Sequence, residues 1–181
     1  MARSSGLQSP TNSILAPVDF EPAARAALQF AAQLAQDAGV PLTILHVVHE
    51  PADRPNYYRR HGGSEVLLPM EVLAERRLDE FLTGVRSQHP DLVTLDEPGV
   101  LLVKGLPGTR IPEVAERMGA AQIVMGRSRG RRLLPGLFAP LSDRVADQCD
   151  IPVTLVHPDG SPEVYGQRPQ RPFNDKAVLG A

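Results

Sequence analysis

Five short apolar runs alternate with stretches of helical periodicity along the chain. Continuous apolar strands are typical of a parallel sheet whose two faces are both covered. The helices between them would supply the right-handed crossovers that parallel strands require. The pattern therefore predicts an α/β domain, a five-stranded parallel sheet with helices on both faces, with strands at residues 14–18, 41–48, 100–104, 122–125 and 152–156.

The segments between these runs carry the signals of helices. Pro22 stands in the first turn of the first helix, where its missing N–H does no harm, and Gly39 ends the apolar periodicity. Further apolar stripes begin near Met70 and Thr109, and a last one begins at Leu141. We therefore expect four helices, each placed between two strands.

Three segments fall outside this alternation. Residues 1–11 are predicted to be a disordered leader, and residues 49–68, with prolines and a glycine pair, a long loop. Residues 158–181 contain four prolines and three glycines and show no core pattern, which predicts a Pro/Gly-rich C-terminal tail. The α/β domain is expected to span residues 12–157.

Composition and charge exclude several classes of protein. The net charge is −2, so the surface as a whole is not typical of nucleic-acid binding. The single cysteine, Cys149, cannot form an internal disulfide and suits a reducing compartment. No apolar run approaches the ~18 residues of a membrane span, and the N-terminus lacks the apolar core of a secretory signal. These features predict a cytoplasmic protein without nucleic-acid or membrane partners.

The order of four segments resembles the universal stress protein family. These segments are ILAPVD, LTILHVV, GLPGTRIPEVAERMGAAQIVMG and DIPVTLV, and the resemblance covers roughly residues 12–157. It implies the flavodoxin-like strand order 3-2-1-4-5, with a nucleotide at the switch point between the first and fourth strands. It also implies a homodimer that pairs through the fifth strand, from Pro152 to Val156, and a role in the stress response.

Nucleotide-binding members of this family end their fourth strand in the pattern G-x2-G-x9-G-[ST]. Glycines let the backbone approach phosphate, and N–H groups at the helix start hold the anion. Gly126 fits the first position, but Arg129 stands at the second glycine, Ala139 at the third and Pro140 at the hydroxyl position. Starting from Gly130 instead places Pro140 at the third glycine. Pro140 also removes one backbone donor, and the nearest hydroxyl is that of Ser142.

Other candidate nucleotide-binding residues lie at the ends of strands. The resemblance implies that Asp19, after Pro17 of the first strand, faces the ribose or adenine, and that Val47 and Met125 flank the adenine. Each has a structural alternative. Asp19 would cap the helix that follows it, and Val47 and Met125 would be core residues.

Four arginines in six residues lie beside this site: Arg127, Arg129, Arg131 and Arg132. Guanidinium groups offer a fork of donors that suits phosphate oxygens. They could replace the lost glycine amides and hold a polyphosphate or another anion. The alternative is a solvated basic loop.

Three functions therefore remain open. The first is a stress-response regulator that binds ATP, with Mg²⁺ only if ATP binds, or another anion through a degenerate loop. The second is a dimeric interaction protein of the same fold without nucleotide binding. The third is a serine hydrolase, because residues 126–130 match G-x-S-x-G with Ser128 as nucleophile and His157 and Asp150 downstream. Asp150 and His157 would lie about 20 Å apart, at opposite ends of one strand, and this distance disfavours the hydrolase.

Overall fold

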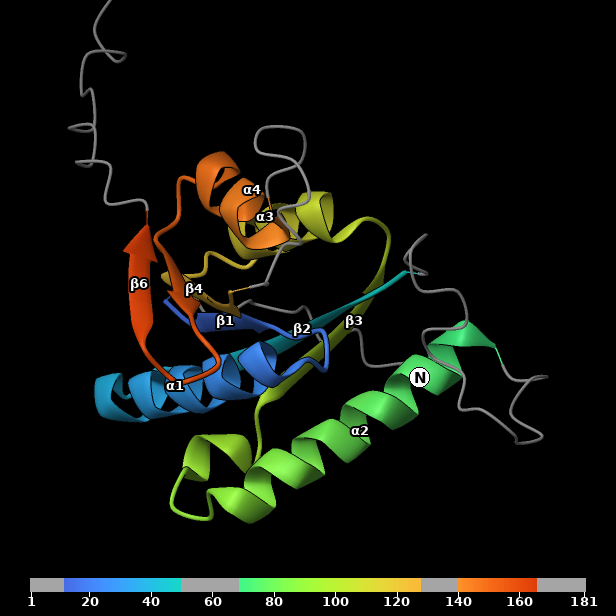
Figure 1. Cartoon of the computed structure of the whole chain (residues 1–181), viewed down its shortest axis with the longest axis vertical. Coiled ribbons are helices and arrows are strands. Elements are labelled where there is room, and N and C mark those ends of the chain that lie inside the picture. Colours follow the sequence, from blue (N-terminus) through green and yellow to red (C-terminus); the bar gives the residue numbers. More distant parts are fainter. Residues whose placement is uncertain (1–11, 50–68, 128–139, 166–181) are drawn as a thin grey trace, which may run out of the picture.

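The computed structural model describes residues 12–49, 69–127 and 140–165. Within them the helices and strands follow one another in the order β1 (Ile14–Pro17), α1 (Pro22–Ala38), β2 (Leu42–Val48), α2 (Met70–Gln88), η2 (Val93–Leu95), β3 (Gly99–Lys104), α3 (Pro107–Arg117), β4 (Gln122–Gly126), α4 (Leu141–Gln148), β5 (Val153–Val156) and β6 (Pro162–Tyr165). Figure 1 shows this alternation of strands and helices.

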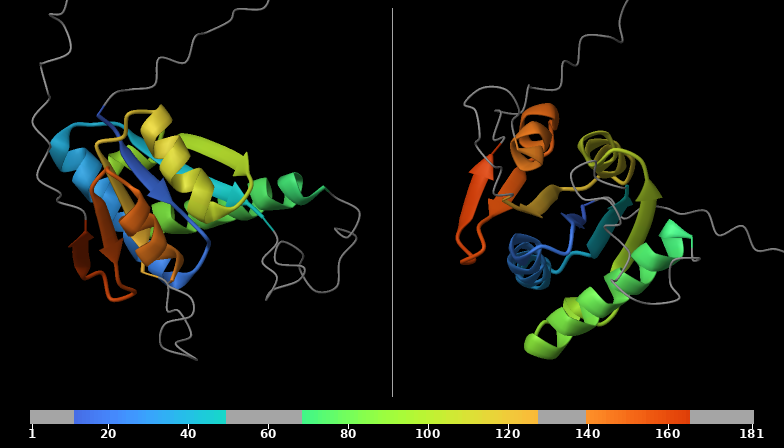
Figure 2. Two further views of the ribbon diagram at one scale, coloured as in Figure 1. Left: turned by 90° about the horizontal axis from the view of Figure 1, so that it is seen from above. Right: turned by 45° about the vertical axis from the view of Figure 1, so that its right-hand side comes forward.

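The strands form one sheet in the order β3-β2-β1-β4-β5-β6. The first five are parallel, as expected, and the predicted order 3-2-1-4-5 is confirmed. The prediction of five strands is wrong by one, because β6 pairs antiparallel with β5 and forms the edge of the sheet. Figure 2 shows β6, in red, beside β5. The segment predicted to be a tail without structure therefore begins with a strand.

Helices cover both faces of the sheet, as expected. α1 and α2 pack on one face, and α3 and α4 pack on the other (Figure 1). Along β1 the side chains alternate between these layers, since Ile14 and Ala16 face α1 whereas Leu15 faces the α3 side. All four residues of β1 are buried. The core is thus divided into two apolar layers by the sheet.

The first helix is built for close packing. Its buried face consists of alanines and one leucine: Ala23, Ala24, Ala27, Leu28, Ala31, Ala32 and Ala35. Small side chains let its backbone approach the sheet, and α1 packs across β1, β4 and β5. Gly39 ends the helix in the left-handed conformation, with its N–H directed to carbonyls of the last turn, as the sequence predicts.

No helix in the described part of the chain is both long and apolar enough to cross a membrane. The predicted leader, the predicted 49–68 loop from residue 50 onward and the chain after residue 165 lie outside the described residues.

Candidate functional site

The carboxyl end of β1 leads into a constrained turn that carries Asp19. Asp19 is exposed, and its Oδ1 accepts a hydrogen bond of 3.2 Å from the backbone N–H of Glu21, just before α1 begins. This bond closes a turn before the helix, whose N-cap residue is Glu21 and which has no side-chain cap, so the helix-capping role predicted for Asp19 is wrong. Phe20, the next residue, has φ +66°, a left-handed conformation that costs energy for a residue with a side chain. The backbone thus bends sharply where β1 ends.

A buried histidine supports this turn from within the core. His46 Nδ1 lies 2.7 Å from the carbonyl oxygen of Val18. Since that oxygen can only accept, Nδ1 carries the proton and donates. The centroid of the Phe20 ring lies 4.4 Å from that of the imidazole, and the guanidinium carbon of Arg77 lies over the Phe20 ring, 4.9 Å from its centroid. The position of Asp19 is therefore fixed by contacts on both sides of it in the chain.

The imidazole of His46 is neutral in the folded protein. Burial lowers its pKa from 6.5 to about 4, and the nearby charges of His49 and Arg77 act in the same direction. The sequence places His46 within an apolar strand, and this was a signal of a buried, hydrogen-bonded histidine. Its link to the turn after β1 depends on the parallel pairing of β1 with β2 and could not be read from the chain alone.

Gly126, at the carboxyl end of β4, is in contact with the first turn of α1. A Cβ at Gly126 would lie 2.6 Å from the carbonyl carbon of Ala23 and 2.7 Å from the backbone nitrogen of Ala24. No side chain fits at such distances, so glycine is required here by packing. The first glycine of the predicted phosphate pattern therefore has a structural role in bringing β4 and α1 together.

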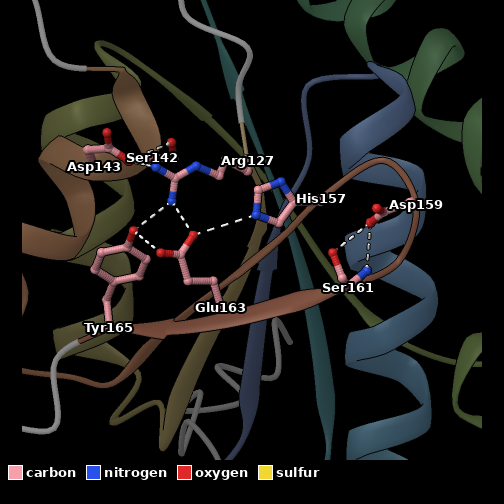
Figure 3. Close-up of polar contacts among 8 residues, drawn as sticks. All are labelled: Arg127, Ser142, Asp143, His157, Asp159, Ser161, Glu163 and Tyr165. Carbon is pink, nitrogen blue, oxygen red and sulfur yellow. Dashed lines mark hydrogen bonds and ion pairs between the residues drawn. The ribbon is translucent and has the colours of Figure 1, made fainter.

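Arg127 is engaged in a cluster of polar contacts with α4 and β6. Its Nη1 donates to Glu163 Oε2 at 2.6 Å and to the Tyr165 hydroxyl at 2.7 Å, and its Nη2 lies 3.6 Å from Asp143 Oδ1. Figure 3 shows these contacts and a further one, in which His157 Nε2 lies 3.5 Å from Glu163 Oε2. The guanidinium of Arg127 is thus engaged by acceptors of its own chain, and its role as an anion ligand stays a prediction.

The contacts of this cluster also lower the pKa of Glu163. The hydroxyl of Tyr165 donates to Glu163 Oε1 at 2.5 Å, and this hydrogen bond, together with the charge of Arg127, lowers the pKa of Glu163. Glu163 and Tyr165 were missed in the sequence because they lie in the segment predicted to be a tail. Their alternation with Pro162 and Val164 was the only signal of a strand.

The start of α4 departs from a phosphate-binding helix start. Pro140 is the residue before the helix and brings no backbone donor. Ser142 is fully buried in the first turn, and its Oγ lies 3.4 Å from Asp143 Oδ1. Arg144, which sequence reasoning did not single out, lies against Gly108 at the start of α3. Arg129, Gly130, Ala139, Arg131 and Arg132 lie outside the described residues.

Val47 and Met125 are core residues in the structure. Their exposed fractions are 5% and 4%, and both belong to the apolar layer beneath α3 and α4. Pro17 is buried at the end of β1. The structural alternative for Val47 and Met125 is therefore present, and contact with a base stays a prediction.

The two described residues of the hydrolase hypothesis, Asp150 and His157, do not lie together. Asp150 precedes β5 and His157 follows it, so the two lie at opposite ends of one strand, as expected. Ser128 lies outside the described residues. Within the described ranges, no group of three or more His, Cys, Asp or Glu side chains is arranged to hold a metal ion.

Comparison with known proteins places this fold in a family. A search of curated proteins found no match. Among solved structures, the universal stress protein UspA of Lactobacillus plantarum is 22% identical with a TM-score of 0.53, over 80% of this chain and 96% of that one. A universal stress protein in complex with cAMP is 16% identical with a TM-score of 0.58, over 81% and 97%.

A third similar structure is the Archaeoglobus fulgidus universal stress protein in complex with dAMP. It is 20% identical with a TM-score of 0.51, over 80% of this chain and 96% of that one. At these identities the likeness establishes the fold. The model of the universal stress protein family matches residues 10–157. Because this match covers most of the sequence, the protein belongs to the universal stress protein family.

Proposed function

We propose that this protein is a cytoplasmic stress-response binding protein that takes an adenosine nucleotide at the carboxyl ends of β1 and β4, without catalysing its hydrolysis. The observation that carries the proposal is the position of Asp19. It is exposed on a fixed turn at the point where the strand order reverses, which is where open α/β sheets bind ligands. A carboxylate there can accept hydrogen bonds from ribose hydroxyls.

The nucleoside contributes most of the affinity in this proposal. Arg127 already donates to Glu163 and Tyr165, and Pro140 brings no N–H to the start of α4. A β- or γ-phosphate would therefore gain little from these two positions. The similar structures with cAMP and dAMP support a ligand with a single phosphate, since they are complexes of proteins with this fold. ATP, with Mg²⁺, would bind about as well as AMP.

Calorimetric titration of the nucleotide-stripped protein tests the proposal. Adenosine, AMP, cAMP and Mg²⁺–ATP are compared, and we expect the dissociation constants of AMP and ATP to agree within about threefold, or less than ~1 kcal/mol. ATP binding that is much tighter than AMP binding would contradict the nucleoside-dominated site. No heat and no rise in the melting temperature with any of the four would overturn nucleotide binding altogether.

A second candidate function is an interaction protein of the same fold that binds no nucleotide. The ion pairs of Arg127 and the proline at the start of α4 favour it, because both remove donors from the phosphate side. The same titration separates the two functions, since only the first predicts saturable binding.

A further inference from the structure

We propose that β6 closes the edge of β5 against a second copy of this chain, and that Arg127 is the positioning residue that holds β6 in place. The proposal concerns self-association through the sheet edge. It does not depend on whether a nucleotide binds. The homodimer predicted through residues 152–156 would form only when β6 leaves the edge of β5.

The edge that β6 covers would otherwise be an apolar template. The exposed fractions of the four β5 residues are 0% for Val153, 1% for Thr154, 0% for Leu155 and 0% for Val156. β6 pairs with every one of them, from Val153 with Tyr165 to Val156 with Pro162. An uncovered strand of this kind presents unpaired N–H and C=O groups to which another chain can add. Closing it therefore controls what the protein can associate with.

β6 runs in the direction that the β5 strand of a second copy would need at this edge. β6 runs antiparallel to β5, whereas the other neighbours in the sheet are parallel. When two identical edge strands pair about a two-fold axis, they must also run antiparallel. A β5 strand from a second copy would thus use the same backbone groups in the same direction. β6 and that strand cannot occupy the edge together.

The turn between β5 and β6 favours pairing within one chain. The N–H of His157 donates to the carbonyl oxygen of Ser161 at 2.9 Å, and Gly160 adopts φ +87°. Asp159 Oδ1 accepts from the backbone N–H of Ser161 at 3.0 Å and from its hydroxyl at 2.7 Å (Figure 3). These bonds fold the chain back on itself and keep β6 close to its own β5.

Side-chain packing alone would hold β6 weakly, and this gives Arg127 its role. Val164 is 58% exposed, and the rest of the strand is exposed or half-buried. Arg127 extends from the end of β4 to Glu163 and Tyr165 on β6 and to Asp143 on α4. Without the Arg127 guanidinium, the carboxylates of Asp143 and Glu163 would lose the cation that they now share. Removing Arg127 should therefore release β6.

Sedimentation equilibrium of the full chain tests the proposal. Wild type is expected at the monomer mass of 19.6 kDa. Arg127→Ala is expected to double in mass with rising concentration. Arg117→Ala is the matched control, because Arg117 is an exposed arginine that pairs with Glu113 on α3, and it should remain monomeric.

Two further variants keep the result interpretable. If Arg127→Ala fails to fold, the double variant Glu163→Gln/Tyr165→Phe removes the same contacts and should also double in mass. Thr154 and Val164 are direct cross-strand partners. Their Cα atoms are therefore about 4.5 to 5.5 Å apart, within reach of a disulfide. Thr154→Cys/Val164→Cys, added to Arg127→Ala, should restore the monomer when oxidised and lose it when reduced.

Hydrogen exchange of the β5 amides gives the second readout. In the Arg127→Ala dimer these amides should stay protected, because the partner's strand pairs with β5. When the variant is diluted to monomer, they should exchange faster than in wild type, because β6 no longer covers them. A wild-type protein that is already dimeric through β5 would overturn the proposal. So would an Arg127→Ala protein and a Glu163→Gln/Tyr165→Phe protein that both stay monomeric with wild-type exchange of β5.

Discussion

The carboxyl ends of β1 and β4 lie side by side in the sheet, yet they are used differently. At the end of β1 an exposed carboxylate stands on a turn that is fixed by His46 and Phe20. At the end of β4 the backbone of α1 fills the space beside Gly126, and Arg127 is paired with acceptors from β6 and α4. Residues of a binding motif can therefore keep their positions while their contacts serve packing and strand attachment.

The largest effect is expected from acidification, which acts on the β1 end. The pKa of His46 is about 4 in the folded protein against 6.5 in the unfolded chain, so the unfolded state binds the proton more readily. The stability due to neutral His46 is complete above pH 6.5 and is lost as the pH falls toward 4. The loss is at most about 3 kcal/mol.

Urea denaturation between pH 7 and pH 4, compared with His46→Phe, measures this loss. The variant loses the hydrogen bond to Val18 and is less stable at pH 7, but it lacks the titrating group. Its stability should therefore fall less steeply with pH than that of wild type. Parallel pH dependences in the two proteins would show that His46 is not the responsible residue.

The next effect concerns the β4 end and its contact with α1. Gly126→Ala places a methyl group less than 3 Å from the backbone of Ala23 and Ala24, and the helix must move to admit it. We expect a loss of about 2 to 3 kcal/mol in the free energy of unfolding, measured by urea denaturation.

Gly84→Ala is the control for this substitution. Gly84 lies inside α2, and its added methyl would meet only the flexible end of the Arg25 side chain, at 3.2 Å. Because alanine favours the helix, this change should stabilise the protein by up to about 1 kcal/mol. A Gly126→Ala protein as stable as Gly84→Ala would contradict the packing role of Gly126.

A smaller effect separates the charge of Asp19 from its hydrogen bond. Asp19→Ala removes the acceptor for the Glu21 N–H and should lower stability by about 1 kcal/mol, the usual net contribution of one hydrogen bond. Asp19→Asn keeps an acceptor and should leave thermal stability unchanged, while it removes the charge proposed to face the ligand. Equal losses of stability in the two variants would mean that the carboxylate charge itself holds the turn.

The sequence was sufficient for the parallel core and insufficient for the β4 end of the site. Periodicity located α1 and the five parallel strands, because each is a local pattern. The sequence did not predict β6, because Pro162–Tyr165 is short, mostly exposed and flanked by turn residues. Glu163 and Tyr165, the partners of Arg127 on β6, were therefore missed as well. The role of Gly126 depends on a helix about a hundred residues earlier in the chain, which no local pattern reveals.

The most direct test of the contrast between the two strand ends is calorimetric titration of AMP into wild type, Asp19→Asn and Arg127→Ala. Asp37→Asn, on the exposed face of α1, is the control for loss of one negative charge. We expect AMP binding to be weakened about tenfold or more in Asp19→Asn, or ~1.4 kcal/mol, and to be unchanged within about twofold in Arg127→Ala. Binding that is lost in Arg127→Ala and retained in Asp19→Asn would contradict this expectation.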